Sequence, residues 1–187
     1  MLRPDFDPTA TAQAEYEFWR AHNDKDIPQL SAALESWTSE LYGLDPETSA
    51  KAVAALLEAT QHHDTRDWDQ ATACAERYYA VIHDHTDLQF NPKQAGELEV
   101  TWWQIHDELE FETDKTRLVN AFSDLYAEVF GTSLEAVRPM ATLKARATVE
   151  HDLAEADGTD PDAAEQHWLA AAESLKRSYQ ALRQPGA

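Results

Sequence analysis

A Glu-x-x-x-Trp-x-x-His pattern occurs twice in this chain, and its Glu and His side chains could bind a metal ion or transfer protons. The copies are Glu15/Trp19/His22 and Glu99/Trp103/His106. Residues at positions i, i+4 and i+7 lie on one stripe of an α-helix, so the three side chains of each copy face the same way. Carboxylate oxygen and imidazole nitrogen are ligands of zinc, iron and manganese, and both groups also carry protons.

A His-Asp doublet also occurs twice, as His63-Asp64 and as His151-Asp152. Adjacent side chains project about 100° apart on a helix, so a doublet can share one ion only near a helix end or with ligands from another helix. Within the longer pattern, Glu and His are about 10 Å apart along the helix axis, which is too far for one ion. A metal site would therefore combine ligands from several helices.

The matched polar residues predict a candidate site of four histidines and four carboxylates. The predicted metal ligands are Glu15, His22, His63, Asp64, Glu99, His106, His151 and Asp152. The predicted ion is divalent zinc, iron or manganese. In dimetal helical bundles Glu precedes His by three residues, whereas here it precedes His by seven. The alternative interpretation is structural, because a histidine on an aromatic helix face is commonly satisfied by a carboxylate or a backbone carbonyl.

Eight helices must position these residues, and Asp, Pro and Gly mark where the helices begin and end. Alternating patterns rich in Val, Ile and Thr are absent, so the predicted fold class is all-α. The predicted helices begin near Pro8, Ile27, Pro46, Trp68, Pro92, Asp114, Ser133 and Pro161, and Gly43 and Gly131 end the second and the sixth. The residues predicted to lie in or near the core are Trp19, Trp37, Leu41, Trp68, Tyr79, Trp103, Phe122, Phe130 and Trp168.

The second half of the chain repeats the order of the first. Residues 26–64 align without gaps on residues 114–152, at an offset of 88. The offset is 84 upstream and 100 downstream, and it changes between helices, where insertions are tolerated. We therefore predict two tandem four-helix units related by internal duplication and packed about a pseudo-two-fold axis. They form one domain over residues 1–187, with repeat units 8–86 and 92–184.

Composition narrows the function classes. The 35 acidic and 15 basic residues give a formal charge of −20, which disfavours nucleic acid and anionic membranes as partners. No Gly-rich phosphate loop and no Gly-x-Ser-x-Gly elbow occur. The single cysteine, Cys74, excludes an intrachain disulfide and is expected to be a small buried residue. Without a signal peptide or a transmembrane run, the expected location is the cytoplasm.

Two functional hypotheses follow. The first is a binding or scaffold module without chemistry of its own, whose partner is a protein or a small molecule held in a groove between the halves. The second is a metal-dependent oxidoreductase or hydrolase, whose His/carboxylate site forms between the two repeats. The sequence leaves a homodimer open under either hypothesis.

Overall fold

The structure, a computed structural model, describes residues 5–110, 112, 114–156 and 158–184. This part of the chain is all-helical, as predicted, with eight α-helices and no strand. The helices are α1 (Pro8–Asn23), α2 (Ile27–Tyr42), α3 (Pro46–Asp64), α4 (Trp68–His85), α5 (Pro92–Leu109), α6 (Thr116–Phe130), α7 (Leu134–Glu155) and α8 (Pro161–Arg183).

A shared cap begins four of the helices. Asp7, Asp45, Asn91 and Asp160 each precede a proline at the start of a helix and accept hydrogen bonds from backbone N–H groups of its first turn. Proline has no N–H group to leave unpaired there, and the side-chain oxygen of the cap satisfies the N–H groups that follow. These Asp-Pro and Asn-Pro pairs explain why the starts of α1, α3, α5 and α8 are readable from sequence.

Helix α6 begins one residue later than a cap at Asp114 would place it. Lys115 holds the cap position and makes no cap hydrogen bond with its side chain. Asp114 still accepts a hydrogen bond from the backbone N–H of Thr116, at 2.9 Å. The predicted ends of α2 and α6 are confirmed, because Gly43 and Gly131 both adopt the left-handed conformation, with φ of 68° and 58°.

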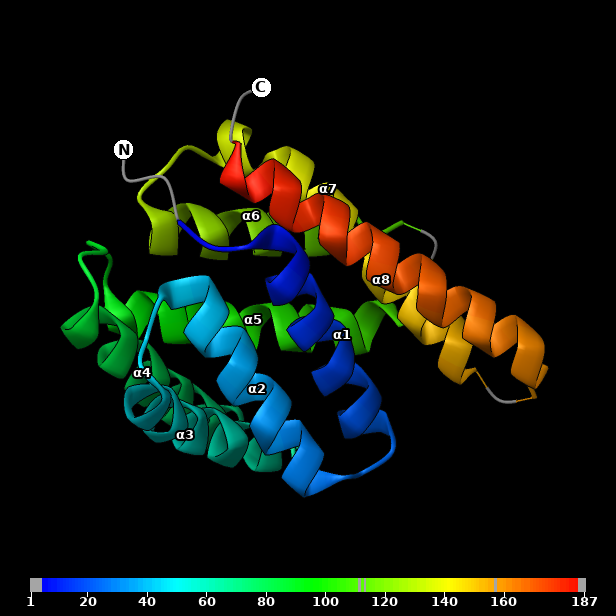
Figure 1. Cartoon of the computed structure of the whole chain (residues 1–187), viewed down its shortest axis with the longest axis horizontal. Coiled ribbons are helices and arrows are strands. Elements are labelled where there is room, and N and C mark those ends of the chain that lie inside the picture. The colour runs from blue at the N-terminus through cyan, green and yellow to red at the C-terminus, as the bar shows by residue number, and fades with distance from the viewer. Residues whose placement is uncertain (1–4, 111, 113, 157, 185–187) are drawn as a thin grey trace.

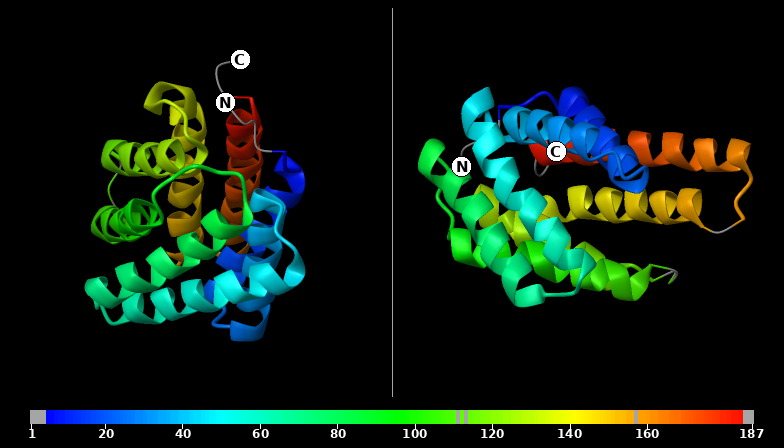
Figure 2. Two further views of the ribbon diagram at one scale, coloured as in Figure 1. Left: turned by 90° about the vertical axis from the view of Figure 1, so that its left-hand side faces the viewer. Right: turned by 90° about the horizontal axis from the view of Figure 1, so that it is seen from below.

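The eight helices form a closed cycle of contacts. Each helix packs on the next helix in the chain, and α8 packs on α1, so the first and last helices are neighbours (Figure 1). The C-terminal end of α7 and the N-terminal end of α8 project beyond the other helices (Figure 2). The helices that carry the predicted site residues therefore surround a common interior.

Aromatic side chains fill much of this interior. Two of the nine predicted core residues, Trp19 and Trp68, are half-buried and pack against the core. The other seven are buried, namely Trp37, Leu41, Tyr79, Trp103, Phe122, Phe130 and Trp168. Helices α4 and α5 approach closely at Gly96, where a Cβ atom would lie 2.5 Å from the backbone nitrogen of Glu76. This close approach sets α5 directly beside α4.

The outer surface carries few large apolar side chains. In the described part of the chain, the only large apolar residues that are exposed are Ile27, Leu134, Leu153 and Leu169. None of the described helices combines the length and the apolar character that crossing a membrane requires.

Candidate functional site

A cavity of about 320 Å³ lies between helices α1 to α7. Its size falls in the range of small-molecule pockets, about 300–1,000 Å³. Much of its wall is aromatic and includes Trp19, Trp37, Tyr42, Trp102, Trp103 and Tyr126. Six of the eight predicted ligands line it: Glu15, His22, His63, Glu99, His106 and His151. The cavity therefore gathers predicted ligands that are as many as 136 positions apart in the chain.

Glu15, on α1, has a complete set of partners although it is only 2% exposed. One carboxylate oxygen accepts a hydrogen bond from the ammonium of Lys144 on α7, and the other accepts from the hydroxyl of Tyr179 on α8. The Tyr179 hydroxyl in turn accepts from the indole N–H of Trp37, at 2.7 Å. The buried negative charge of Glu15 is thus neutralised within the protein.

The Lys144 ammonium is held by aromatic faces as well as by Glu15. It lies 5.5–5.6 Å from the ring centroids of Phe122, Tyr126 and Tyr179. Aromatic rings attract a cation that lies over their faces, and the attraction grows when the cation is desolvated. Lys144 itself is 4% exposed, so this ammonium depends entirely on its carboxylate and ring partners.

Glu99, on α5, has a hydroxyl partner but no cationic one. It is 8% exposed, and its Oε2 accepts a hydrogen bond from the hydroxyl of Tyr79 on α4, at 2.7 Å. Within the described residues, no Lys, Arg or His nitrogen lies within 4.0 Å of its carboxylate oxygens. Burial raises the pKa of Glu99, and the opposing effects of Tyr79, of the Trp102 and Trp103 indoles and of the more distant Lys144 offset only part of this.

Each doublet histidine lies between two tryptophan rings, one from its own half of the chain and one from the other half. All four ring pairs are edge-on, so the imidazole edge or face meets an indole without stacking on it. The centroid distances are 5.4 and 5.5 Å from His63 to Trp68 and Trp103, and 5.2 and 5.3 Å from His151 to Trp168 and Trp19.

Residues from α5 and α7 form a compact polar cluster beside the cavity. One nitrogen each of His106 and His151 and one oxygen of Asp152 lie within 4.8 Å of one another. The Asp152 Oδ1 atom is 3.1 Å from His106 Nε2 and 3.3 Å from His151 Nδ1. The Oδ2 atom accepts from the ammonium of Lys115 at 3.2 Å, and Glu155 lies 3.0 Å from His151 Nε2.

This arrangement favours the charged forms of both doublet residues. Burial alone would lower the pKa of His151, but its hydrogen bonds to Asp152 and Glu155 and their charges raise the pKa to about 9. Burial alone would raise the pKa of Asp152, but hydrogen bonds from His106, His151 and Lys115 lower the pKa to about 2. At neutral pH the cluster is therefore an ion-pair network.

The first-half doublet is in a more open setting. His63 Nε2 lies 3.2 Å from Asp107 Oδ1, while the Asp64 side chain is 66% exposed and does not line the cavity. His22 lines the cavity but does not belong to the compact cluster. Six of the eight predicted ligands thus line one cavity, and three of the eight form a compact group, so metal binding by the full set stays a prediction.

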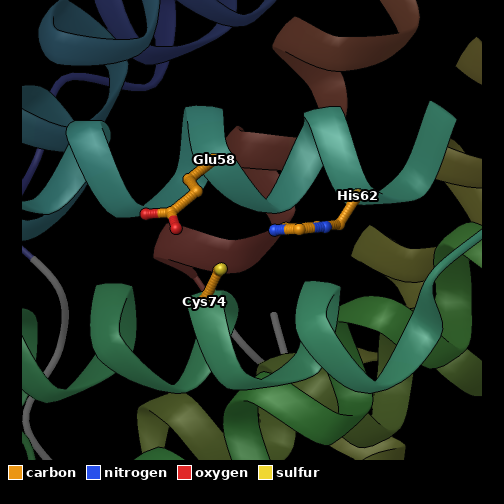
Figure 3. A group of neighbouring side chains, drawn as sticks. All are labelled: Glu58, His62 and Cys74. Carbon is orange, nitrogen blue, oxygen red and sulfur yellow. The ribbon is translucent and has the colours of Figure 1, made fainter. Parts of the chain in front are cut away.

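A second cluster lies between α3 and α4 and joins residues that the sequence does not connect. Glu58 and His62 are one turn apart on α3, and Cys74 faces them from α4, with one ligand atom of each within 4.8 Å (Figure 3). Arg77 donates to Glu58 Oε2 at 2.5 Å and lies 3.2 Å from the Cys74 sulfur. Burial raises the pKa of Cys74, so the thiol form is favoured. Cys74 is 1% exposed, as predicted.

Lys115 and Lys144 were not predicted from the sequence, although they form ion pairs with the predicted ligands Asp152 and Glu15. Lysine is rarely buried, so a helix-surface position is the ordinary expectation for both. One signal was available for Lys144, because the offset of 88 places it opposite Leu56, and an apolar residue there indicates an inward-facing position. Leu56 is indeed buried and lines the cavity.

The cavity thus combines an aromatic wall, a neutralised acid and an acid without a counter-charge, beside an ion-pair cluster. These features are compatible with holding a ligand, and the compact cluster also has the donor atoms of a metal site. No protein-family model, curated protein or solved structure matches this chain.

Proposed function

We propose that this protein binds a small molecule in the cavity between its two halves. The supporting observation is the cavity itself, about 320 Å³ in volume, with an aromatic wall and a few buried polar groups. Aromatic rings provide large contact areas for an apolar body, and a small number of buried polar groups sets the orientation of a ligand. Protein interiors are usually close-packed, so a cavity of about 320 Å³ inside the cycle of helices supports a binding role.

We propose also that the two halves are copies of one unit, packed about a pseudo-two-fold axis. Polar contacts across the halves support this, because Tyr79 of the first half donates to Glu99 of the second and Tyr179 of the second donates to Glu15 of the first. The doublet histidines contact tryptophans of the opposite half in the same reciprocal way. Under this proposal each half contributes the glutamate of its Glu-Trp-His pattern to a shared cavity.

Filling the cavity tests the binding function. Tryptophol, a neutral indole with an apolar body, is the probe, and its binding is measured by calorimetry. Thr60→Phe adds a ring to the cavity wall and should weaken binding at least tenfold. Thr142→Phe makes the same change on an exposed face of α7 and should leave binding unchanged. Both threonines bond only a carbonyl of the preceding turn, so the two variants lose the same local contact.

The folded state of both variants is checked by circular dichroism and by a thermal melt. Equal dissociation constants for Thr60→Phe and the unaltered protein would show that tryptophol binds outside this cavity, and would contradict a ligand site there. So would the absence of binding at 10 mM both by tryptophol and by tryptamine, its ammonium analogue.

A divalent metal ion bound by His106, His151 and Asp152 is the second candidate function. The separations of 3.1 and 3.3 Å between their donor atoms support it, since ligands about 2.0–2.1 Å from a tetrahedral zinc ion are about 3.3 Å apart. A bound ion would displace the proton of His151 and would acidify a bound water.

Zinc titration with calorimetry tests this candidate. Binding at pH 7 with proton release, lost in His151→Gln and kept in His62→Gln, would support it. The His62 variant is the control because that histidine belongs to the other cluster with metal-ligand geometry. If zinc binding is lost only in His62→Gln, the metal site is the cluster of α3 and α4. If no zinc binds below millimolar concentration, neither cluster is a zinc site.

A further inference from the structure

We propose that the ligand of the cavity carries a positively charged ammonium group that pairs with Glu99. This inference rests on the proposed binding function and names the chemical class of the ligand. The protein already holds one buried ammonium group, that of Lys144, and its contacts show how a second could be held.

Lys144 shows which surroundings stabilise a cation in this interior. Its ammonium donates to a buried glutamate, Glu15, which also accepts from a tyrosine hydroxyl, and aromatic faces surround the remaining sides. A buried carboxylate offsets the desolvation of the ammonium, and the rings replace part of its hydration.

Glu99 shares part of these surroundings, with tryptophan indoles in place of the rings around Lys144 and without a cation. It is buried, it accepts from the hydroxyl of Tyr79, and it adjoins the indoles of Trp102 and Trp103. The chain position that matches Lys144 at the offset of 88 is Leu56, which lines the cavity and supplies no charge. An ionised carboxylate without a counter-charge is costly in a buried site. An ammonium group of a ligand would supply what Lys144 supplies to Glu15.

The charge around the cavity favours the same ligand class. Acidic side chains along its wall comprise Glu15, Glu99, Asp107, Glu110 and Glu155, and its only lysine is already paired with Glu15. The whole chain carries a formal charge of −20. A negative potential of this kind attracts cations and repels anions. Two of the indoles that line the cavity, those of Trp102 and Trp103, adjoin Glu99, so a ligand with an apolar body and an ammonium end fits both features.

Three probes that share an indole ring but differ in the charge of the side chain test whether the charge of the ligand decides its affinity. Tryptamine carries an ammonium, tryptophol replaces it with a neutral hydroxyl, and indole-3-acetate carries a carboxylate. Calorimetry with the full chain at pH 7 should give a dissociation constant for tryptamine at least tenfold below that of tryptophol, and indole-3-acetate should bind most weakly.

Glu99→Gln removes the charge while keeping an acceptor for Tyr79, so it should abolish the advantage of tryptamine and leave tryptophol binding within twofold. Glu97→Gln makes the same change on an exposed turn of α5 and should alter neither. A thermal melt of each variant verifies that it is folded. If Glu99→Gln does not fold, Glu99→Asp takes its place. Aspartate is one methylene shorter, so its carboxylate lies farther from the ligand, and the advantage of tryptamine should decrease.

The possible results distinguish the two proposals. Equal binding of tryptamine and tryptophol, or an advantage of tryptamine that survives in Glu99→Gln, overturns the pairing with Glu99 and leaves the cavity as a ligand site. Strongest binding of indole-3-acetate overturns the cationic class. Absence of binding by all three probes at 10 mM overturns the binding function and this inference with it.

Discussion

Glu15 and Glu99 begin the same Glu-Trp-His pattern, and each accepts a hydrogen bond from a tyrosine of the opposite half. The difference that decides their charge lies at one matched position, where the second half has Lys144 and the first has Leu56. Lys144 pairs with Glu15 inside the protein, whereas Leu56 supplies no charge and Glu99 has no cationic partner within 4.0 Å among the described residues. The presence of a lysine at one matched position and not at the other therefore separates an acid paired within the protein from the acid that we propose to bind the ligand.

The two His-Asp doublets differ in a parallel way. Asp152 is buried and is held by Lys115 and two histidines, while Asp64 lies largely in solvent. The second half thus contains both buried lysines, and with them the stronger ion pairs. We expect the second half to respond more strongly than the first to changes of charge and of pH.

The largest effect is expected from removing the cation beside Glu15. Lys144→Met leaves a buried carboxylate unpaired and should reduce the free energy of unfolding by about 3–5 kcal/mol at pH 7. Leu56→Met at the matched position keeps volume and polarity and should cost less than about 1.5 kcal/mol. Urea denaturation measures both. Adding Glu15→Gln to Lys144→Met should restore much of the loss, and a loss below about 1 kcal/mol in the single variant would contradict a charged Glu15.

A smaller effect is expected from titrating His151. Its pKa is raised from 6.5 to about 9 on folding, so the charged imidazole stabilises the folded state below pH 6.5. As the pH rises from about 6.5 to about 9, this contribution, roughly 3 kcal/mol at most, should be lost. Urea denaturation of the chelator-treated protein across this range measures it. His151→Asn should remove this part of the pH dependence, and identical slopes in the two proteins would contradict the ion-pair network.

The smallest effect is expected at Glu99, and its sign is opposite to that at Lys144. Burial raises the pKa of Glu99, so its ionisation costs stability as the pH rises through the ordinary glutamate value. Glu99→Gln should therefore increase the free energy of unfolding at pH 7 by about 1 kcal/mol in the absence of ligand. Glu97→Gln should have almost no effect. Destabilisation by Glu99→Gln would indicate a counter-charge that Glu99 already has.

Much of the fold was predictable because helix ends are local. An Asp or Asn followed by Pro places a cap and a fixed φ at the same boundary, and Gly43 and Gly131 end their helices for a conformational reason that neighbouring residues do not change. Lys115 shows the limit, because it occupies a cap position while its side chain bonds with Asp152 on another helix.

The candidate site was predictable in composition but not in geometry. Comparing the two halves selected six residues that line the cavity, because matched polar residues at inward-facing positions stand out from a solvated surface. Which acid would meet a lysine depends on contacts between helices far apart in the chain, such as that of Glu15 with Lys144 across 129 positions. Residue spacing within one helix contains no information about such contacts.

The contact between α8 and α1 has a consequence for how the polypeptide can be rearranged. Because the first and last helices are neighbours, the order of contacts around the molecule has no intrinsic starting point. A circularly permuted chain, opened in the segment before Pro92 and joined from α8 to α1 by a short flexible linker, would preserve every helix-to-helix contact. Two separately expressed halves would instead have to find each other, since each supplies the tyrosine that the glutamate of the other requires.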